Sequence, residues 1–174
     1  MVAKIPNSVY ESGRRSGAWV KYKITKSQEF VIGGYTLPEG GRKYFGSLVV
    51  GYNSPDGLVF AGRVGTGFSD KMLASVYGKL QKLTVPSCPF VNLPEKTKGR
   101  WGLGITPAVM QRCQWVKPVL VAQVKFTEWT HDDQLRQPVV SRAADGQRGK
   151  GRSSRIDREG DPKGSLSSDK APMF

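Results

Sequence analysis

SDKMLASVYGKLQKL, residues 69–83, is the segment that decides the fold, because its apolar side chains recur at the spacing of an amphipathic helix. These apolar positions are Met72, Leu73, Val76, Tyr77, Leu80 and Leu83. Ser69 or Asp70 can cap the first turn, and the helix should end before Pro86. We therefore expect one substantial helix in the middle of a chain whose other regular segments have the character of strands.

Three strand-like segments precede this helix: EFVIGGYTL (29–37), YFGSLVVGY (44–52) and LVFAGRVG (58–65). Gly33 and Gly34 interrupt the first segment and suggest a bulge or bend. The stretch Pro55-Asp56-Gly57 supplies the turn chemistry that would join the second and third segments as a hairpin.

A proline-rich connector follows the helix and leads to WVKPVLVAQVKFTEWT, residues 115–130, the longest strand and apolar enough to be central. The order is three strands, one helix and further strand. In a five-stranded OB-fold barrel, a helix between the third and fourth strands closes the barrel, and nucleic acid lies across one face. A small β-sandwich is the alternative, but the single mid-chain helix favours the OB fold.

The charge of the chain favours a polyanionic partner. Its 174 residues carry 27 Lys and Arg against 14 Asp and Glu, a formal net charge of +13. Cys88 and Cys113 form no CxxC pair, and one histidine is too few for a zinc site with them, so both are expected to be reduced thiols. No apolar run approaches the length of a membrane span.

The segment SGAWVKYKI, residues 16–24, has a pattern of basic residues that predicts an anion-binding site. Trp19, Lys21 and Lys23 alternate, so an extended backbone places them on one face, just after Arg14 and Arg15. Neighbouring ammonium groups repel each other unless an anion lies between them. The alternative is a solvated strand edge, where lysine is common because it opposes aggregation.

Several segments together are similar to the C-terminal part of ATP-dependent DNA ligases, especially the bacterial type used in end joining. They are VAK (2–4), GRRSGAWVKYK (13–23), FVIGGYTLPEGGRKYFGSLVVGY (30–52), FAGRVGTGFS (60–69) and LVAQVKFTEWT (120–130). The resemblance implies that residues 1–24 are a remnant of the adenylation (nucleotidyltransferase) domain and that residues 25–140 are a mainly β, Greek-key OB-fold domain. The composition of residues 141–174, rich in Gly, Ser and mixed charge, predicts a disordered basic tail.

The resemblance also implies roles for individual basic residues. Lys4, Lys21 and Lys23 would face the phosphates of ATP or of the adenylate. The candidates for contacts with DNA phosphates are Arg14, Arg15, Arg42, Lys43, Arg63 and Lys71. Each of these could instead be a solubilising surface charge, and Arg63 could serve a tight β-turn.

Nick sealing in this family begins with a lysine in a K-x-D-G motif, which attacks the α-phosphate of ATP. Ser54 stands at the lysine position before Asp56-Gly57, and Ala143 stands there before Asp145-Gly146. No catalytic residue is therefore expected in this chain. Alone it should be inactive, and ATP and Mg²⁺ would act in the intact enzyme.

Both ends depart from the family pattern. Met1 occupies the place of a branched apolar residue in the family, and VVSRAADGQR replaces an expected motif resembling F-L-G-L-R-x-D-K. These departures suggest a reading frame that starts inside a longer ligase gene, with a one-base insertion near Val139 or Val140.

The expected function is that of the C-terminal part of a ligase in bacterial DNA repair and recombination, including non-homologous end joining. Its partners would be nicked double-stranded DNA and an adenylation domain, and it would act as a monomer in the cytosol near the nucleoid. The alternatives are a stand-alone, non-catalytic DNA-binding OB module and a gene remnant.

Other side chains gave weaker signals. His131, Asp132 and Asp133 are best explained by a polar turn, since neighbours in sequence seldom form a catalytic triad or a cation cage. Four aromatic residues could stack on bases, although their strand-like setting favours the core: Tyr35, Tyr44, Phe45 and Phe60.

Overall fold

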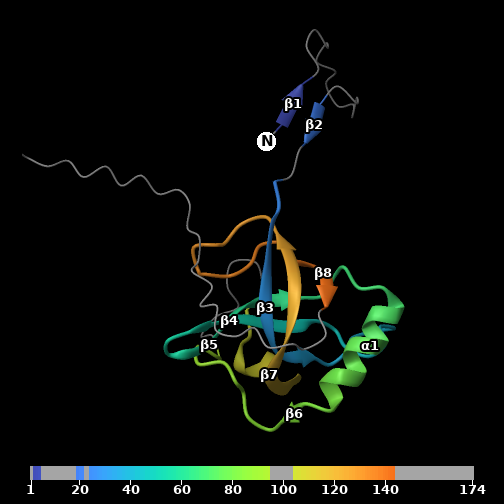
Figure 1. Cartoon of the computed structure of the whole chain (residues 1–174), viewed down its shortest axis with the longest axis vertical. Helices are drawn as coiled ribbons and strands as arrows, with labels where there is room; N and C mark the ends of the chain where they lie inside the picture. The colour runs from blue at the N-terminus through green and yellow to red at the C-terminus, as the bar shows by residue number, and fades with distance from the viewer. Residues whose placement is uncertain (1, 5–18, 22–23, 95–103, 144–174) are drawn as a thin grey trace, which may run out of the picture.

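The computed structural model describes residues 2–4, 19–21, 24–94 and 104–143. Within them, the main elements are β3 (Lys26–Thr36), β4 (Leu48–Ser54), β5 (Gly57–Val64), α1 (Asp70–Gln81), β7 (Cys113–Phe126) and β8 (Val139–Ala143). Short elements complete the set: β1 (Val2–Lys4), β2 (Trp19–Lys21), β6 (Thr84–Val85) and α2 (Pro107–Met110). Three strands, a helix and two further strands, β7 and β8, form the OB fold that the sequence predicts (Figure 1).

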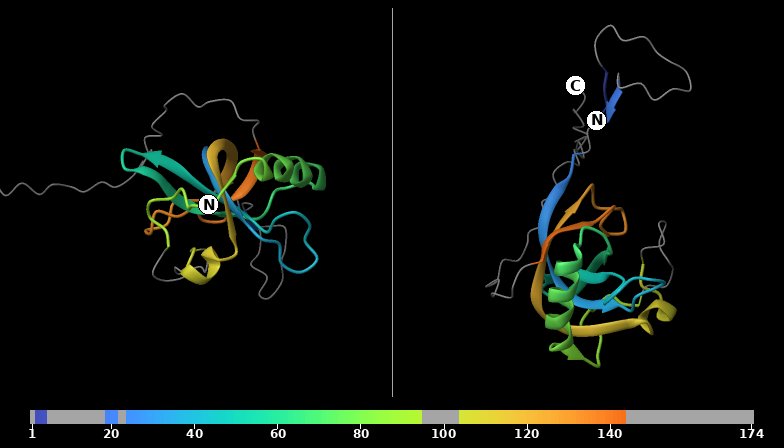
Figure 2. Two further views of the ribbon diagram at one scale, coloured as in Figure 1. Left: turned by 90° about the horizontal axis from the view of Figure 1, so that it is seen from below. Right: turned by 90° about the vertical axis from the view of Figure 1, so that its right-hand side faces the viewer.

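One curled antiparallel sheet carries the fold. Its strand order is β5-β4-β3-β7-β6, and β8 also pairs with β7. The sheet closes on itself at β5 through two backbone hydrogen bonds. Leu135 N–H, in the segment before β8, donates to Ala61 C=O of β5 at 2.8 Å, and Val140 N–H of β8 donates to Thr66 C=O, just after β5, at 2.9 Å. These bonds turn an open sheet into a barrel-like shell, with α1 against one side (Figure 2).

The predicted bulge in the first long strand is confirmed. The register of β3 shifts between Ile32 and Gly34 in its ladders with both β4 and β7. A Cβ at Gly33 would lie 2.5 Å from the ring of Phe90, and one at Gly34 would lie 2.8 Å from Gln114 C=O. Only a residue without a side chain allows this close approach, and the bulge bends β3 so that it can pair along two neighbours.

The predicted helix is also confirmed, with Ser69 as its N-cap. Leu73, Val76 and Leu80 are buried, and they pack into the larger core cluster beside Phe30 and Phe45. The helix ends at Gln81, well before the proline that the sequence identified as its limit. α1 therefore covers the core of the barrel, as a helix between the third and fourth barrel strands should.

The N-cap offers a direct test of how this helix is stabilised. Ser69 Oγ accepts a hydrogen bond from Met72 N–H at 3.3 Å, which satisfies one of the free donors of the first turn. We expect Ser69→Ala to lower the free energy of unfolding by about 1 kcal/mol, measured by urea denaturation. Ser69→Asp keeps an acceptor at the cap and should stay within about 0.5 kcal/mol of the wild type. Equal losses in both variants would contradict a capping role.

β1 and β2 form a separate two-stranded ladder. Residues 5–18 and 22–23, between and after these strands, lie outside the described part of the chain, as do residues 144–174 with the expected disordered tail. β8 ends at Ala143, so this strand continues past the domain boundary expected after residue 140. No helix in the described ranges is long and apolar enough to cross a membrane.

Candidate nucleic-acid interface

A hollow lined by arginine lies between the loop after β3, strand β5 and the start of β7. Its volume is about 310 Å³. Its lining residues are Thr36, Leu37, Glu39, Arg42, Gly46, Ser47, Arg63, Val109 and Arg112. Arg42 lies in the β3–β4 loop and Arg63 in β5, and Arg112 is the residue that precedes β7. Three guanidinium groups from distant parts of the sequence therefore share one surface depression.

The charge balance of this hollow is positive. Arg112 Nη1 lies 2.5 Å from Glu39 Oε1, and both side chains are more than half exposed. Arg42 and Arg63 add two further positive charges against this single carboxylate. Hydroxyls line the wall, where Thr36 Oγ1 and Ser47 Oγ are 3.0 Å apart and Ser47 N–H donates to Thr36 Oγ1 at 2.9 Å. Guanidinium groups beside hydroxyl donors are suited to phosphate oxygens.

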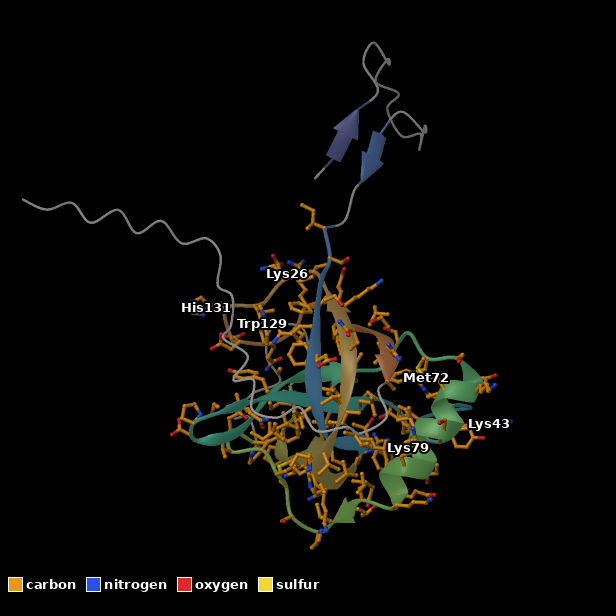
Figure 3. All side chains as sticks on the ribbon, viewed as in Figure 1. Lys26, Lys43, Met72, Lys79, Trp129 and His131 are labelled. Atoms are coloured by element: carbon orange, nitrogen blue, oxygen red, sulfur yellow. The ribbon has the colours of Figure 1, made fainter. Side chains whose placement is uncertain are left out.

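A second depression, also of about 310 Å³, runs between α1 and the sheet. Its lining residues are Ile32, Ser69, Lys71, Met72, Ser75, Val76, Lys79, Leu120 and Ala143. Lys71, Ser75 and Lys79 are spaced four residues apart, so they lie along one face of the helix. Figure 3 labels Lys79 and Met72 on α1. Two lysines above an apolar floor can hold a backbone phosphate while aliphatic groups contact sugars.

The DNA-contact candidates separate into four groups. Arg42 and Arg63 lie in the arginine hollow, and Lys71 lines the groove beside α1. Lys43 is exposed in the same loop as Arg42 but lines neither depression. Arg14 and Arg15 lie outside the described residues.

Among the ATP-phosphate candidates, Lys4 and Lys21 fall in paired strands. Lys4 is opposite Trp19 and Lys21 is opposite Val2 in the antiparallel ladder. Lys23 lies outside the described residues.

Three residues of these depressions were missed by sequence reasoning: Arg112, Glu39 and Lys79. The four-residue spacing of Lys71, Ser75 and Lys79 on a predicted helix was a usable signal. Arg112 gave no local signal, because it joins the hollow only through a long-range contact in which Leu37 N–H donates to Arg112 C=O at 2.9 Å.

The aromatic candidates are mostly core, as their strand-like setting suggested. Tyr35, Phe45 and Phe60 are at most 5% exposed, so they cannot stack on a base. Tyr44 is 39% exposed and lies between Lys43 and the buried Phe45.

The described residues contain no group of three His, Cys, Asp or Glu side chains placed to hold a metal ion. His131, Asp132 and Asp133 lie exposed in the turn that follows β7.

Cys113, beside the arginine hollow at the start of β7, is a buried free thiol. Burial raises the pKa of the Cys113 thiol from 9.0 to about 11. The nearby Arg63 guanidinium lowers this pKa and Cys88 raises it, but both effects are smaller than that of burial. Its Sγ–H donates to Val109 C=O at 3.3 Å.

This raised pKa predicts a loss of stability at alkaline pH. Between pH 9 and 11 the unfolded state releases the Cys113 proton while the folded state keeps it, so unfolding becomes easier as pH rises. In reducing buffer, the wild type should lose roughly 2 kcal/mol more unfolding free energy than Cys113→Ala between pH 8.5 and 11. Parallel pH profiles of the two proteins would contradict this.

The comparisons with known proteins agree with this architecture. The family model for the ATP dependent DNA ligase C terminal region matches residues 41–145. This range contains the lining residues of both depressions, except those in β3 and at the start of the loop that follows it. The chain belongs to the ATP-dependent DNA ligase family. The OB fold is thus the C-terminal region of a ligase, and the resemblance found in the sequence motifs is confirmed.

Curated relatives point to one kind of ligase. The chain is 43% identical over 139 residues to the multifunctional non-homologous end joining protein LigD of Mycolicibacterium smegmatis, covering 79% of this chain and 17% of that protein. It is 37% identical over 142 residues to the LigD of Pseudomonas aeruginosa, covering 80% of this chain and 16% of that protein. The chain thus spans about a sixth of the length of the curated relatives it matches.

Solved structures show the same fold. The ligase domain of LigD from M. tuberculosis matches with a TM-score of 0.58 at 38% identity, over 82% of this chain and 43% of that one. A mycobacterial DNA ligase D complexed with ATP and MES matches with a TM-score of 0.54 at 36% identity, over 82% of this chain and 42% of that one.

Proposed function

We propose that this chain is the DNA-contacting OB domain of an ATP-dependent ligase of the LigD type, which serves non-homologous end joining, repair and recombination in a bacterial cytosol. The observation that carries the proposal is the coincidence of the family match with the arginine hollow. Arg42, Arg63 and Arg112 all fall within residues 41–145. A positive, hydroxyl-lined depression on an OB barrel is the chemistry that phosphate contacts require.

In this proposal the chain positions DNA and does not perform the first chemical step. Arg42, Arg63 and Arg112 hold one strand of a nicked duplex by its phosphates, while Lys71 and Lys79 hold a neighbouring backbone segment. Five cations acting on the backbone give sequence-independent binding that weakens steeply with salt. A ligase needs this behaviour, since breaks occur at any sequence.

The reacting lysine would come from an adenylation domain, because Ser54 and Ala143 occupy the lysine positions before the two Asp-Gly pairs of this chain. ATP bound there would supply the adenylate that activates the 5′-phosphate for attack by the 3′-hydroxyl. Lys4, Lys21 and Lys23 would contribute positive charge toward the ATP phosphates. The pairing of β1 and β2, the strands that carry Lys4 and Lys21, supports this role.

A reconstitution assay tests the proposal. A LigD-type adenylation domain, expressed separately, is mixed with the full chain as a monomer, and sealing of a labelled nicked duplex is measured against the adenylation domain alone. We expect sealing to rise at least tenfold, because the OB domain holds the nick in place for reaction. The matched control is the chain with Arg42→Gln and Arg63→Gln, which should give much less gain.

The outcome also separates the alternative function. If the chain binds duplex DNA with a steep salt dependence but adds nothing to sealing, it is a stand-alone binding module. If it neither binds DNA nor improves sealing, the proposal fails.

A further inference from the structure

Tyr44 occupies an unusual backbone conformation at an exposed position. Its φ is +71°, in the left-handed region that Gly and Asn favour and that a bulky side chain seldom adopts. Phe45 N–H donates to Lys43 C=O at 3.0 Å across it, which makes Tyr44 the centre of a tight γ-turn of the strained, positive-φ kind. Such strain persists only where surrounding contacts hold it, and it gathers at functional sites.

The contacts that hold Tyr44 are aromatic. Its ring lies 5.6 Å from the ring of Tyr77 on α1, measured between centroids, at an interplanar angle of 50°. Tyr77 in turn meets the buried Tyr35 edge-on at 5.9 Å. The next residue, Phe45, is fully buried and packs edge-on against Phe68 at 5.2 Å. The turn is therefore anchored by Phe45 and backed by Tyr77, and the Tyr44 ring is held in place with part of its surface in solvent.

The surroundings of Tyr44 are positively charged. Arg42 and Lys43 precede it directly, and Lys43 lies beside α1 in Figure 3. Among residues 24–94 and 104–143, Tyr44 is the one Phe, Tyr or Trp in the set of exposed large hydrophobic side chains. An exposed ring, backed by another ring and flanked by cations, combines the two features that bind single-stranded nucleic acid: a base-stacking surface and phosphate contacts.

We propose that Tyr44 is a stacking site for an unpaired nucleobase in a single-stranded DNA extension, adjoining the arginine hollow. This inference rests on the proposed DNA-binding function. It adds a stacking contact with a base to the proposed contacts with phosphates. A paired base within a duplex keeps its faces covered by its neighbours, so the ring would engage only an end or a gap where a base is free.

Fluorescence anisotropy with the full chain tests the site. The probes are a blunt duplex, the same duplex with a four-nucleotide single-stranded extension, and the same extension made of abasic nucleotides. The wild type should bind the base-bearing extension about 5- to 10-fold more tightly than the abasic one, the loss expected for one partly exposed stack. Tyr44→Asn should abolish this preference, because asparagine tolerates the positive φ but lacks the ring. Tyr44→Phe should keep the preference.

Val139→Ala is the matched control. Val139 lies in β8, is 38% exposed, close to the 39% of Tyr44, lines neither depression and carries no aromatic ring. This variant should keep the preference for the base-bearing extension, and the thermal midpoints of all three variants should show that they are folded.

Three results would overturn the proposal. If the wild type binds both extensions equally, or if Tyr44→Asn keeps the preference, the ring does not stack on a base, while blunt-duplex binding would leave the DNA-binding function standing. If the chain binds none of the three probes, both the stacking site and the proposed function fail.

Discussion

Replacing both Arg42 and Arg63 by glutamine is expected to weaken binding to nicked duplex DNA by about 10- to 100-fold at moderate salt. Each substitution would remove one charge-assisted hydrogen bond to a DNA phosphate. In a solvated hollow, such a bond contributes about 1.5 kcal/mol or less to the binding free energy. The slope of log affinity against log salt concentration should also fall by about 2, because two fewer counterions are released on binding. Anisotropy titrations at several salt concentrations measure both quantities.

The control for this prediction is a double variant that removes the same number of positive charges at positions outside the arginine hollow. Lys82 and Lys117 are exposed and line neither depression, so the double glutamine variant at these positions loses two positive charges without touching the hollow. It should weaken binding by less than about threefold, through the overall field alone. If the two double variants behave alike, net charge drives DNA binding and the hollow is not a specific site. Thermal midpoints must be compared as well, since Arg63 is part of β5.

The sequence predicted those features whose cause is local. Helix α1 (Asp70–Gln81) could be predicted from residues 69–83 because an N-cap serine and a 3.6-residue apolar period act within one segment. The hairpin at Pro55-Asp56-Gly57 and the bulge at Gly33-Gly34 follow from backbone preferences of a few neighbouring residues. Each of these features can therefore be predicted from its own short segment, without the rest of the sequence.

The arginine hollow could be predicted only in part because it is assembled by the fold. Arg42 and Arg63 were among the candidates that the family resemblance implied, whereas Arg112 enters through the pairing of the chain before β7 with the end of β3. Glu39 then neutralises part of the charge of Arg112, which no sequence pattern indicates. The strained turn at Tyr44 was equally hidden, since its φ is imposed by the burial of Phe45 and by the ring of Tyr77 on α1.

Phe30→Ala is expected to lower the free energy of unfolding by about 3–5 kcal/mol, the largest stability effect we predict. Phe30 is 1% exposed, and its ring lies 5.9 Å from Phe126 and 5.8 Å from Trp129, while Phe126 and Trp129 are 5.6 Å apart. These three rings join β3 to the end of β7 and to the loop that returns to β5, so a cavity there loosens the closure of the barrel. Val31→Ala is the control, since Val31 is the next residue, points to the opposite face and is only half-buried, and it should cost about 1 kcal/mol. Urea denaturation measures both variants, and a loss below 1 kcal/mol for Phe30→Ala would show that the ring cluster does not hold the barrel closed.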